Sequence, residues 1–164
     1  LSLMNFLLDE SYIRPQFIQL NVGSITYLIS EISYLMIIMT RKVSIGFMLL
    51  ICMQGFHSLE EYAGRLWEVF LPAKILCGLV SPDLEFGFVV INLSVFVLGL
   101  ISAAWVFLKH NHVSKFLLLF WMIFEFLNGA GHIIWTISAL SYTPGIITAC
   151  IMISIVLYLL KQIK

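Results

Sequence analysis

The chain has 164 residues, of which 61% are hydrophobic and only 11% are charged. Soluble domains carry about 25% charged residues, so this chain has too few polar side chains to cover a globule, and the composition predicts an integral, multi-pass membrane protein. Nine basic residues balance nine acidic residues, which leaves no excess of positive charge for binding nucleic acid.

Residues 1–42 differ in pattern from the rest of the chain and are treated as a separate N-terminal region. Residues 24–40 are apolar and run directly into Arg41 and Lys42. A full span here would need a turn of almost no length before the next apolar run. We therefore expect an interfacial or partly inserted helix, with an additional span as the alternative. The earlier part, around Arg14, is expected to be a surface arm.

Four apolar stretches in residues 43–164 are candidates to cross a membrane, which takes about 20 mainly apolar residues in an α-helix. The runs are continuous and do not alternate between apolar and polar residues, which indicates helices and not the strands of a β-barrel. The predicted fold is therefore an all-α bundle of four transmembrane helices. These helices are expected at residues 43–61, 86–108, 116–140 and 145–160.

The segment between the first two spans, residues 62–85, is too apolar for a plain linker. We expect a short helix that lies flat in the membrane interface or re-enters the membrane. Trp67 is the expected interfacial anchor, since tryptophan is enriched at that depth, and Pro72 is expected to interrupt the helix. Such a segment would roof the groups that lie beneath it.

Basic residues predict the orientation of the bundle. One pair precedes the first predicted span, a second pair lies between spans two and three, and a third pair follows span four. In a four-span topology all three positions face the same side, which we assign, together with the C-terminus, as cytoplasmic. The residues are Arg41, Lys42, Lys109, Lys115, Lys161 and Lys164.

A histidine and two glutamates stand at the end of the first predicted span. His57, Glu60 and Glu61 are three and four residues apart, so they share one face of a helix. Ionisable side chains inside a membrane cost about 2.5–3.5 kcal/mol each and commonly face the bundle interior, where they are paired or functional. Taken singly, each of these residues could be a satisfied or solvated group at the interface.

The third span carries a second polar stripe, made by Glu125, Asn128 and His132. Counted from ends that face the same side, His57 lies about 21 Å and His132 about 24 Å into the membrane, at 1.5 Å per residue. The two histidines are therefore predicted to lie at one level toward the outer leaflet and to face a common cavity, with Glu125 near the middle of the membrane. Asn92 of the second span is a further candidate for this layer.

The other two histidines, His110 and His112, belong to the turn KHNHVSK between spans two and three. This turn is polar and is predicted to face solvent and lipid headgroups. Neither histidine is therefore assigned to the polar layer.

Three short elements follow one another along the chain: HSLEE at 57–61, NGAGH at 128–132 and YTPG at 142–145. Their order resembles the HxxEE family of small integral membrane proteins, which has an HxxEE motif, then an Asn and Gly-His element, then a YSPG-like element. Thr143 replaces the serine here. The resemblance covers residues 43–160 and implies a small membrane enzyme with its site at these elements, without naming a reaction.

The third element also has a physical interpretation of its own. Pro144 and Gly145 are typical of a turn that leads into a helix. Tyr142 has two interpretations: its hydroxyl caps the site, or its ring belongs to the aromatic belt of the membrane interface.

The polar layer supports three hypotheses, of which a metal-dependent enzyme is preferred. In this hypothesis His57, Glu61 and His132 bind a divalent metal, zinc or iron, because imidazole and carboxylate are ligands of both. A metal-bound water would then hydrolyse or modify a lipid or another small hydrophobic or amphipathic substrate. Glu60 or Glu125 would be the general base. The remaining predicted catalytic residues are Asn128 and Tyr142.

The second hypothesis is acid–base chemistry on a lipid without a metal, as in an isomerase-like enzyme. The third has no catalysis: His57 and His132 bind haem, or the layer passes a proton or a metal ion across the membrane. Four spans make a thin bundle for transport, and a homo-oligomer would weaken that objection. Membrane lipids are the expected partners in every case.

Overall fold

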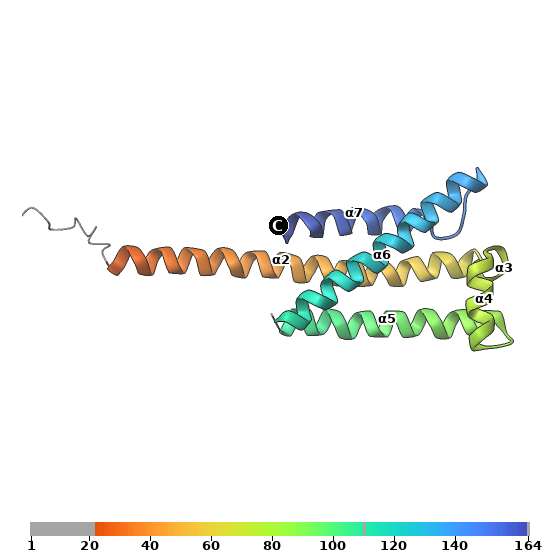
Figure 1. The fold of residues 1–164 in the computed structure, drawn as a ribbon, viewed down its shortest axis with the longest axis horizontal. Coiled ribbons are helices and arrows are strands. Elements are labelled where there is room, and N and C mark those ends of the chain that lie inside the picture. Colours follow the sequence, from red (N-terminus) through yellow and green to blue (C-terminus); the bar gives the residue numbers. More distant parts are fainter. Residues whose placement is uncertain (1–21, 110, 164) are drawn as a thin grey trace, which may run out of the picture. The chain divides into compact units, whose positions relative to one another are not determined.

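The structure is a computed structural model that describes residues 22–109 and 111–163, without the side chains of residues 22–26 and 28–40. The described residues form helices and no strand, as the sequence predicted. In chain order the helices are α2 (Val22–Ala63), α3 (Leu66–Val69), α4 (Leu71–Val80), α5 (Leu84–Leu108), α6 (His112–Ala139) and α7 (Ile146–Gln162) (Figure 1).

Among the described residues, three helices are long and apolar enough to cross a membrane, which indicates a membrane protein. They are Arg41–Ala63, Leu84–Leu108 and His112–Ala139, the first being the C-terminal part of α2. Helix α7 is apolar but has 17 residues. At 1.5 Å per residue it measures about 25 Å, somewhat less than the roughly 30 Å of a hydrocarbon core.

The chain divides into two units, Leu1–Ile38 and Met39–Lys164, where the sequence predicted a boundary after Lys42. In the first unit the structure describes helical backbone from Val22 onward. The predicted surface arm around Arg14 lies outside the described residues.

Helix α2 is continuous across Arg41 and Lys42, where the sequence predicted that one helix ends and the first span begins. The physical reason is that residues 24–45 contain neither glycine nor proline. Those two residue types are the ones that end helices most effectively, so no residue in this stretch ends the helix.

Residues 62–85 contain two short helices, where one short flat helix or a re-entrant segment was expected. Arg65 has φ 51°, in the left-handed region, and separates α2 from α3. Pro72 lies in the first turn of α4, where the missing N–H is no loss, so it helps to start a helix instead of interrupting one. Helices α3 and α4 lie at one end of α5, and α4 runs across the direction of the long helices (Figure 1).

Trp67 is a core residue and not the exposed interfacial anchor that the sequence predicted. It is 3% exposed, and its ring centroid lies 4.9 Å from that of Phe88 on α5. Beside it, Gly87 lets α4 touch α5, because a Cβ there would lie 2.4 Å from the carbonyl oxygen of Cys77. These contacts hold α3 and α4 against the end of the bundle.

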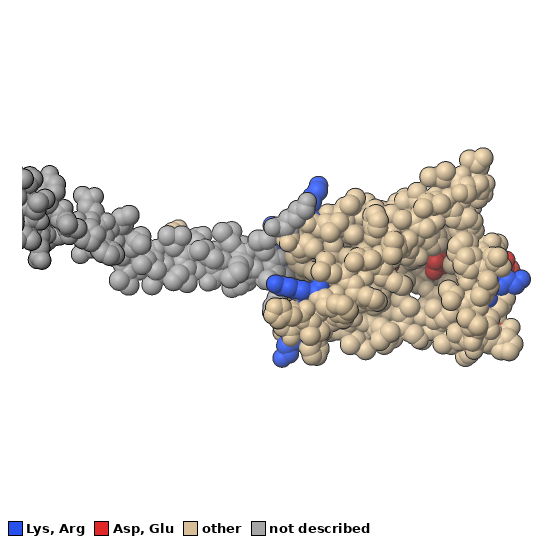
Figure 2. Space-filling view, viewed as in Figure 1, with Lys and Arg blue, Asp and Glu red and all other residues tan. Residues whose placement is uncertain are grey.

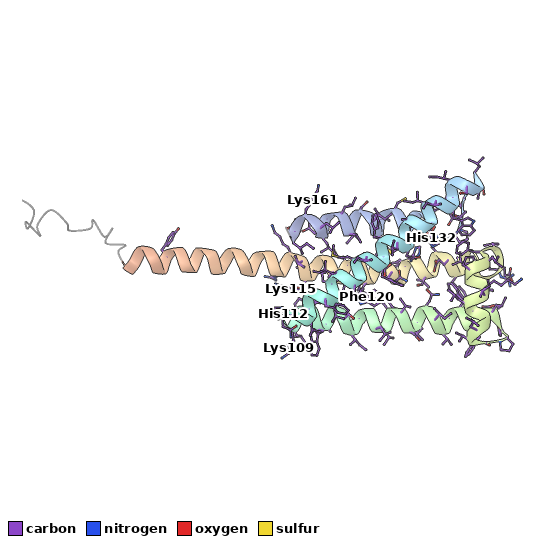
Figure 3. All side chains as sticks on the ribbon, viewed as in Figure 1. Lys109, His112, Lys115, Phe120, His132 and Lys161 are labelled. Atoms are coloured by element: carbon purple, nitrogen blue, oxygen red, sulfur yellow. The ribbon has the colours of Figure 1, made fainter. Side chains whose placement is uncertain are left out.

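Most basic residues of unit Met39–Lys164 gather at the opposite end, which we call the basic end, whereas Arg65 and Lys74 lie at the end of α3 and α4. Figure 3 shows Lys109, Lys115 and Lys161 together where α5 turns into α6 and where α7 ends. Blue side chains lie at this end in Figure 2, and a further blue patch lies at the other end. The candidate span of α2 begins here at Arg41. The span of α2 and helix α6 therefore run in the same direction, as the sequence predicted.

An apolar core fills the half of the bundle nearer the basic end. It combines the early part of each span that starts there with the late part of α5 and α7. The polar layer begins where this core stops. The core residues are Phe47, Leu50, Ile51, Ala103, Val106, Leu118, Trp121, Met122, Met152, Val156 and Leu159.

Candidate functional site

The polar layer lies in the interface between α2 and α6. Glu61 contacts His132, and Gln54 contacts Glu125, so the two contacts share one offset of 71 residues in sequence. Seven residues separate the contacts on each helix, which is about two helical turns. Parallel helices in a fixed register therefore bring both pairs together.

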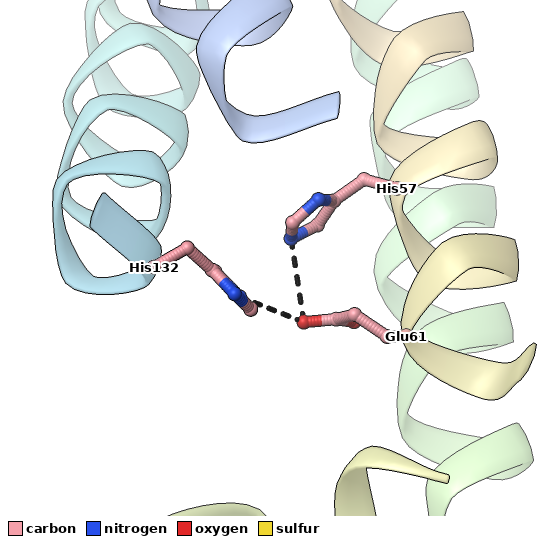
Figure 4. A group of neighbouring side chains, drawn as sticks. All are labelled: His57, Glu61 and His132. Atoms are coloured by element: carbon pink, nitrogen blue, oxygen red, sulfur yellow. Dashed lines mark hydrogen bonds and ion pairs between the residues drawn. The ribbon is translucent and has the colours of Figure 1, made fainter. Parts of the chain in front are cut away.

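His57, Glu61 and His132 meet at one point (Figure 4). Oε1 of Glu61 lies 3.0 Å from Nε2 of His132 and 3.3 Å from Nε2 of His57. The two imidazole rings stand edge to face, with centroids 4.7 Å apart. His57 is fully buried, and the other two are 6% exposed. The prediction that the first and third spans aim their imidazoles at a common place is therefore confirmed.

These three side chains fit a divalent cation. One possible ligand atom from each lies within 4.8 Å of the others. Ligands at about 2.1 Å from a tetrahedral zinc ion are about 3.4 Å apart, close to the two distances measured from Glu61. Within the described part of the chain, two buried ring nitrogens have no hydrogen-bond partner: Nε2 of His57 and Nδ1 of His132. Buried polar atoms are rarely left in this state.

Gly145 forms one wall of this cluster. A Cβ at this position would lie 2.7 Å from Cε1 of His132 and 2.8 Å from Cε1 of His57. Its φ is 90°, a backbone conformation that residues with a side chain rarely adopt. The glycine that the sequence assigned to a turn therefore also lets the loop lie directly against both imidazoles.

The rest of the YTPG element fastens this loop to α2 and α6. The side chains of Thr143 and Thr136 are hydrogen-bonded to each other, and Thr143 is buried. The ring of Pro144 packs on Gly64, where a Cβ would lie 2.4 Å from Cγ of the proline. The element therefore positions the wall of the cluster as well as starting a helix.

Glu60, predicted as a general base, faces the start of α7 and not the cluster. Its carboxylate accepts hydrogen bonds from the backbone N–H of Ile147 (3.2 Å) and of Thr148 (2.9 Å). It also accepts from the hydroxyls of Thr148 (2.6 Å) and Tyr142 (2.8 Å). The N-cap residue of α7, Gly145, makes no side-chain cap. Glu60 therefore satisfies the first amides of α7 in its place.

Thr148 is a site residue that the sequence did not reveal. Its Oγ1 lies 2.8 Å from Nδ1 of His57 and 2.6 Å from Oε2 of Glu60, so it connects the imidazole to the carboxylate. In the sequence, the feature that could have indicated its role was a hydroxyl in the first turn of an apolar helix. Such hydroxyls commonly bond within their own helix, which made that signal weak.

Glu125 and Asn128 belong to a second polar group, the Gln54–Glu125 pair and its neighbour. Glu125 is fully buried. The amide of Gln54, oriented with its nitrogen toward the carboxyl, donates to Oε2 of Glu125 at 2.8 Å. Asn128 follows Glu125 by three residues on α6, so the two share one face of the helix. This group lies about two helical turns from the contact between Glu61 and His132.

Asn92, a further candidate for the layer, lies beside Ser58, the residue that follows His57 on α2. Ser58 donates to Oδ1 of Asn92 at 2.8 Å, and the amide of Asn92 donates to the carbonyl of Phe88 at 3.1 Å. Ser58 and Asn92 line a mostly apolar groove of about 450 Å³ between α2 and α5. His112 lies at the basic end, away from the cluster (Figure 3). His110 lies outside the described residues.

Comparison with known protein families supports the resemblance to the HxxEE family. Residues 47–159 match the family described as "Protein of unknown function with HXXEE motif". No curated protein and no solved structure matches the chain. The family match spans more than half of the chain and includes the HSLEE, NGAGH and YTPG elements. The chain therefore belongs to the family of proteins with the HXXEE motif.

Proposed function

We propose that this protein is a membrane enzyme in which His57, Glu61 and His132 bind a divalent metal. The convergence of three buried ligand atoms within 4.8 Å carries the proposal. Two histidines and one glutamate are a ligand set of catalytic zinc, which keeps its fourth position open, whereas structural zinc sites have four protein ligands. Zinc is therefore the first candidate and iron the second.

The reaction class we propose is hydrolysis of an ester, phosphoester or amide in a lipid or another amphipathic molecule. A metal bound here would supply a water with a pKa near 7. The residues of the chain hold the ligand atoms together and limit access of bulk water, since His57, Glu61 and His132 are all buried. A lipid is the proposed substrate class because lipid surrounds the spans at the depth of the cluster.

We further propose a four-span topology with α7 as the fourth span. In this arrangement α6 leads away from the basic end and α7 leads back to it, and α7 packs along α6. The basic end would face the cytoplasm, since lysine and arginine accumulate on that side.

A second candidate is acid–base catalysis without a metal. Both imidazoles approach one oxygen of Glu61, at 3.0 and 3.3 Å, and such a set can accept and deliver protons on a substrate. Haem is not favoured by the geometry. The ring centroids are 4.7 Å apart, and the rings lack the room between them that a porphyrin plane needs.

The test is elemental analysis of the protein purified in detergent, combined with turnover of a panel of phospholipids and acylglycerols. We expect one equivalent of zinc or iron in the wild type and loss of at least about 100-fold in metal affinity in His57→Ala and His132→Ala, since removing even an outer partner of a ligand costs 10–100-fold. His112→Ala is the matched control, because His112 lies at the basic end.

Equal metal content in all four proteins would refute the proposed site. A wild type that lacks metal yet hydrolyses or isomerises a lipid, with activity lost in both cluster variants and kept in His112→Ala, would instead support the second candidate. Membrane insertion of each variant is checked by carbonate extraction, because a misinserted protein would lose metal for another reason.

A further inference from the structure

We propose that Thr148, held by Glu60, is a positioning residue that fixes His57 with the lone pair of Nε2 directed at Glu61. The inference rests on the proposed metal site for its functional meaning, although it concerns an arrangement of protons that exists with or without a metal. We call the hydrogen-bonded chain from Glu60 through Thr148 to His57 the relay. Glu60 anchors this relay, in place of acting as the general base that its sequence position indicated.

The first step concerns the single proton of the Thr148 hydroxyl. Oγ1 lies 2.6 Å from Oε2 of Glu60, 2.8 Å from Nδ1 of His57 and 3.2 Å from the carbonyl oxygen of Gly145. Glu60 accepts from two backbone amides and two hydroxyls, which fills the four lone-pair positions of an ionised carboxylate. The short bond between Thr148 and Glu60 therefore uses the threonine proton.

The second step concerns Nδ1 of His57. With its proton given to Glu60, the hydroxyl of Thr148 offers only a lone pair to the ring. A hydrogen bond at 2.8 Å between these two atoms then requires the proton on Nδ1. In a neutral imidazole the other nitrogen, Nε2, is consequently unprotonated, because the bond at one ring nitrogen sets the state of the other.

The third step concerns what Nε2 faces. This atom is buried, has no hydrogen-bond partner among the described residues and lies 3.3 Å from Oε1 of Glu61. A lone pair and a carboxylate oxygen that face each other repel unless a cation or a proton lies between them. The relay therefore gives His57 the state that a metal ligand needs, as hydrogen-bonded outer partners do in known metal sites.

The relay is restrained at Thr148, which bonds to Glu60 at two points. Threonine is branched at Cβ and has few rotamers, and the backbone N–H of Thr148 also donates to Glu60 at 2.9 Å. Glu60 and His57 lie three residues apart on one face of α2, and both bond to Thr148 of α7. The docking of α7 therefore sets the orientation of the ring.

The test compares Thr148→Val, which keeps the shape and removes the hydroxyl, with Thr148→Ser, which keeps the hydroxyl. Ser154→Ala is the matched control, because Ser154 lies on the same helix and donates to the carbonyl of Cys150 within that helix. The first readout is the tautomer of His57 in chelator-treated, ¹⁵N-histidine-labelled protein in detergent, assigned by the signal that is absent in His57→Ala.

We expect the Nδ1-protonated tautomer in the wild type, in Thr148→Ser and in Ser154→Ala. In Thr148→Val the proton is expected to move to Nε2, where it can bond Glu61. A wild-type His57 that carries its proton on Nε2 overturns the inference, and so does a tautomer that is the same in wild type and in Thr148→Val. This readout decides the inference even if the protein binds no metal, in which case the proposed function alone fails.

The second readout is zinc affinity, measured by competition with a chromophoric chelator. We expect Thr148→Val to bind zinc about 10–100-fold more weakly than the wild type, the range found for outer partners of metal ligands. Thr148→Ser and Ser154→Ala should stay close to the wild type. Tight zinc binding by the wild type together with unchanged affinity in Thr148→Val would overturn the inference and leave the proposed metal site intact.

Discussion

Two polar groups lie in the same interface between α2 and α6, two helical turns apart, and they are built differently. In the first, the amide of Gln54 supplies the hydrogen that the carboxyl of Glu125 can accept, so the pair is satisfied. In the second, both imidazoles approach one oxygen of Glu61, while Nε2 of His57 and Nδ1 of His132 keep no hydrogen-bond partner among the described residues. Burial of an acid is common to both groups, whereas two buried ring nitrogens without a partner distinguish the second.

The surroundings of the two groups differ as well. The Gln54–Glu125 pair borders the apolar core, where Ile51 and Met122 are buried. The cluster is bounded by the YTPG loop, whose Gly145 touches both imidazoles. A polar pair that only joins two helices needs no such wall. The loop therefore strengthens the view that the cluster, and not the pair, is the site.

The sharpest test of this comparison exchanges each carboxylate for an amide. Glu61→Gln removes the charge that both imidazoles approach, so we expect metal affinity to fall by at least about 100-fold, more than loss of an outer partner causes. Glu125→Gln is the matched variant, and we expect it to keep its metal because Gln54 can bond an amide as well as a carboxyl. Metal content after dialysis gives the answer. Equal losses in the two variants would mean that both groups form one site.

A second test uses two glycines in neighbouring elements. Gly145→Ala places a Cβ against both imidazoles and strains a residue with φ 90°, so we expect a loss of about 1–3 kcal/mol in stability together with weaker metal binding. Gly131→Ala is the control, since no atom lies within 4 Å of its added Cβ, and helix propensity should raise stability by about 0.5–1 kcal/mol. Thermal denaturation followed by circular dichroism measures the stability of both variants.

A Gly145→Ala protein with wild-type stability and wild-type zinc affinity would show that the loop does not bound the cluster. The difference between the cluster and the Gln54–Glu125 pair would then depend on His57, Glu61 and His132 alone.

The smallest effect is expected at Tyr142. Burial, and after it the hydrogen bond to Glu60, raises the pKa of this phenol above its ordinary value of 10.0. A raised pKa in the folded state stabilises the protein fully below pH 10, and this contribution is lost as the pH rises through the folded value. Tyr142→Phe should therefore lower stability slightly at pH 8 and flatten its fall between pH 10 and pH 12.

Chemical denaturation of wild type and Tyr142→Phe at these pH values measures the difference. Metal content should be unchanged, because Tyr142 reaches the cluster only through Glu60. Parallel stability curves for the two proteins across this pH range would show that the bond does not form in solution.

Much of this arrangement could be predicted from the sequence because it depends on helical periodicity. The spacing of His57 and Glu61, together with the depth of His132, predicted that the three would meet, since parallel spans fix both face and level. Trp67 was misassigned because its type is common both in the interface and in cores, and only packing against Phe88 separates the two.

The remaining parts depend on how α7 docks, which periodicity does not determine. Glu60 lies on the same face of α2 as His57 and Glu61. Its partners are nevertheless the first amides of α7, 87 and 88 residues away in sequence. Thr148 and Gln54 are polar residues with apolar neighbours in their helices, and a hydroxyl in such a place commonly bonds within its own helix. Their roles became apparent only from the side chains that they contact.

The place of Gly145 and Thr148 in the chain has a consequence for biosynthesis. A ribosome delivers His57, Glu61 and His132 before it delivers the YTPG loop and α7 that enclose them. During that interval the three side chains are present, but the ring of His57 lacks its partner and the cluster lacks a wall. Enclosure of the cluster is therefore tied to the synthesis of α7, and the proposed loading of an ion would follow that step.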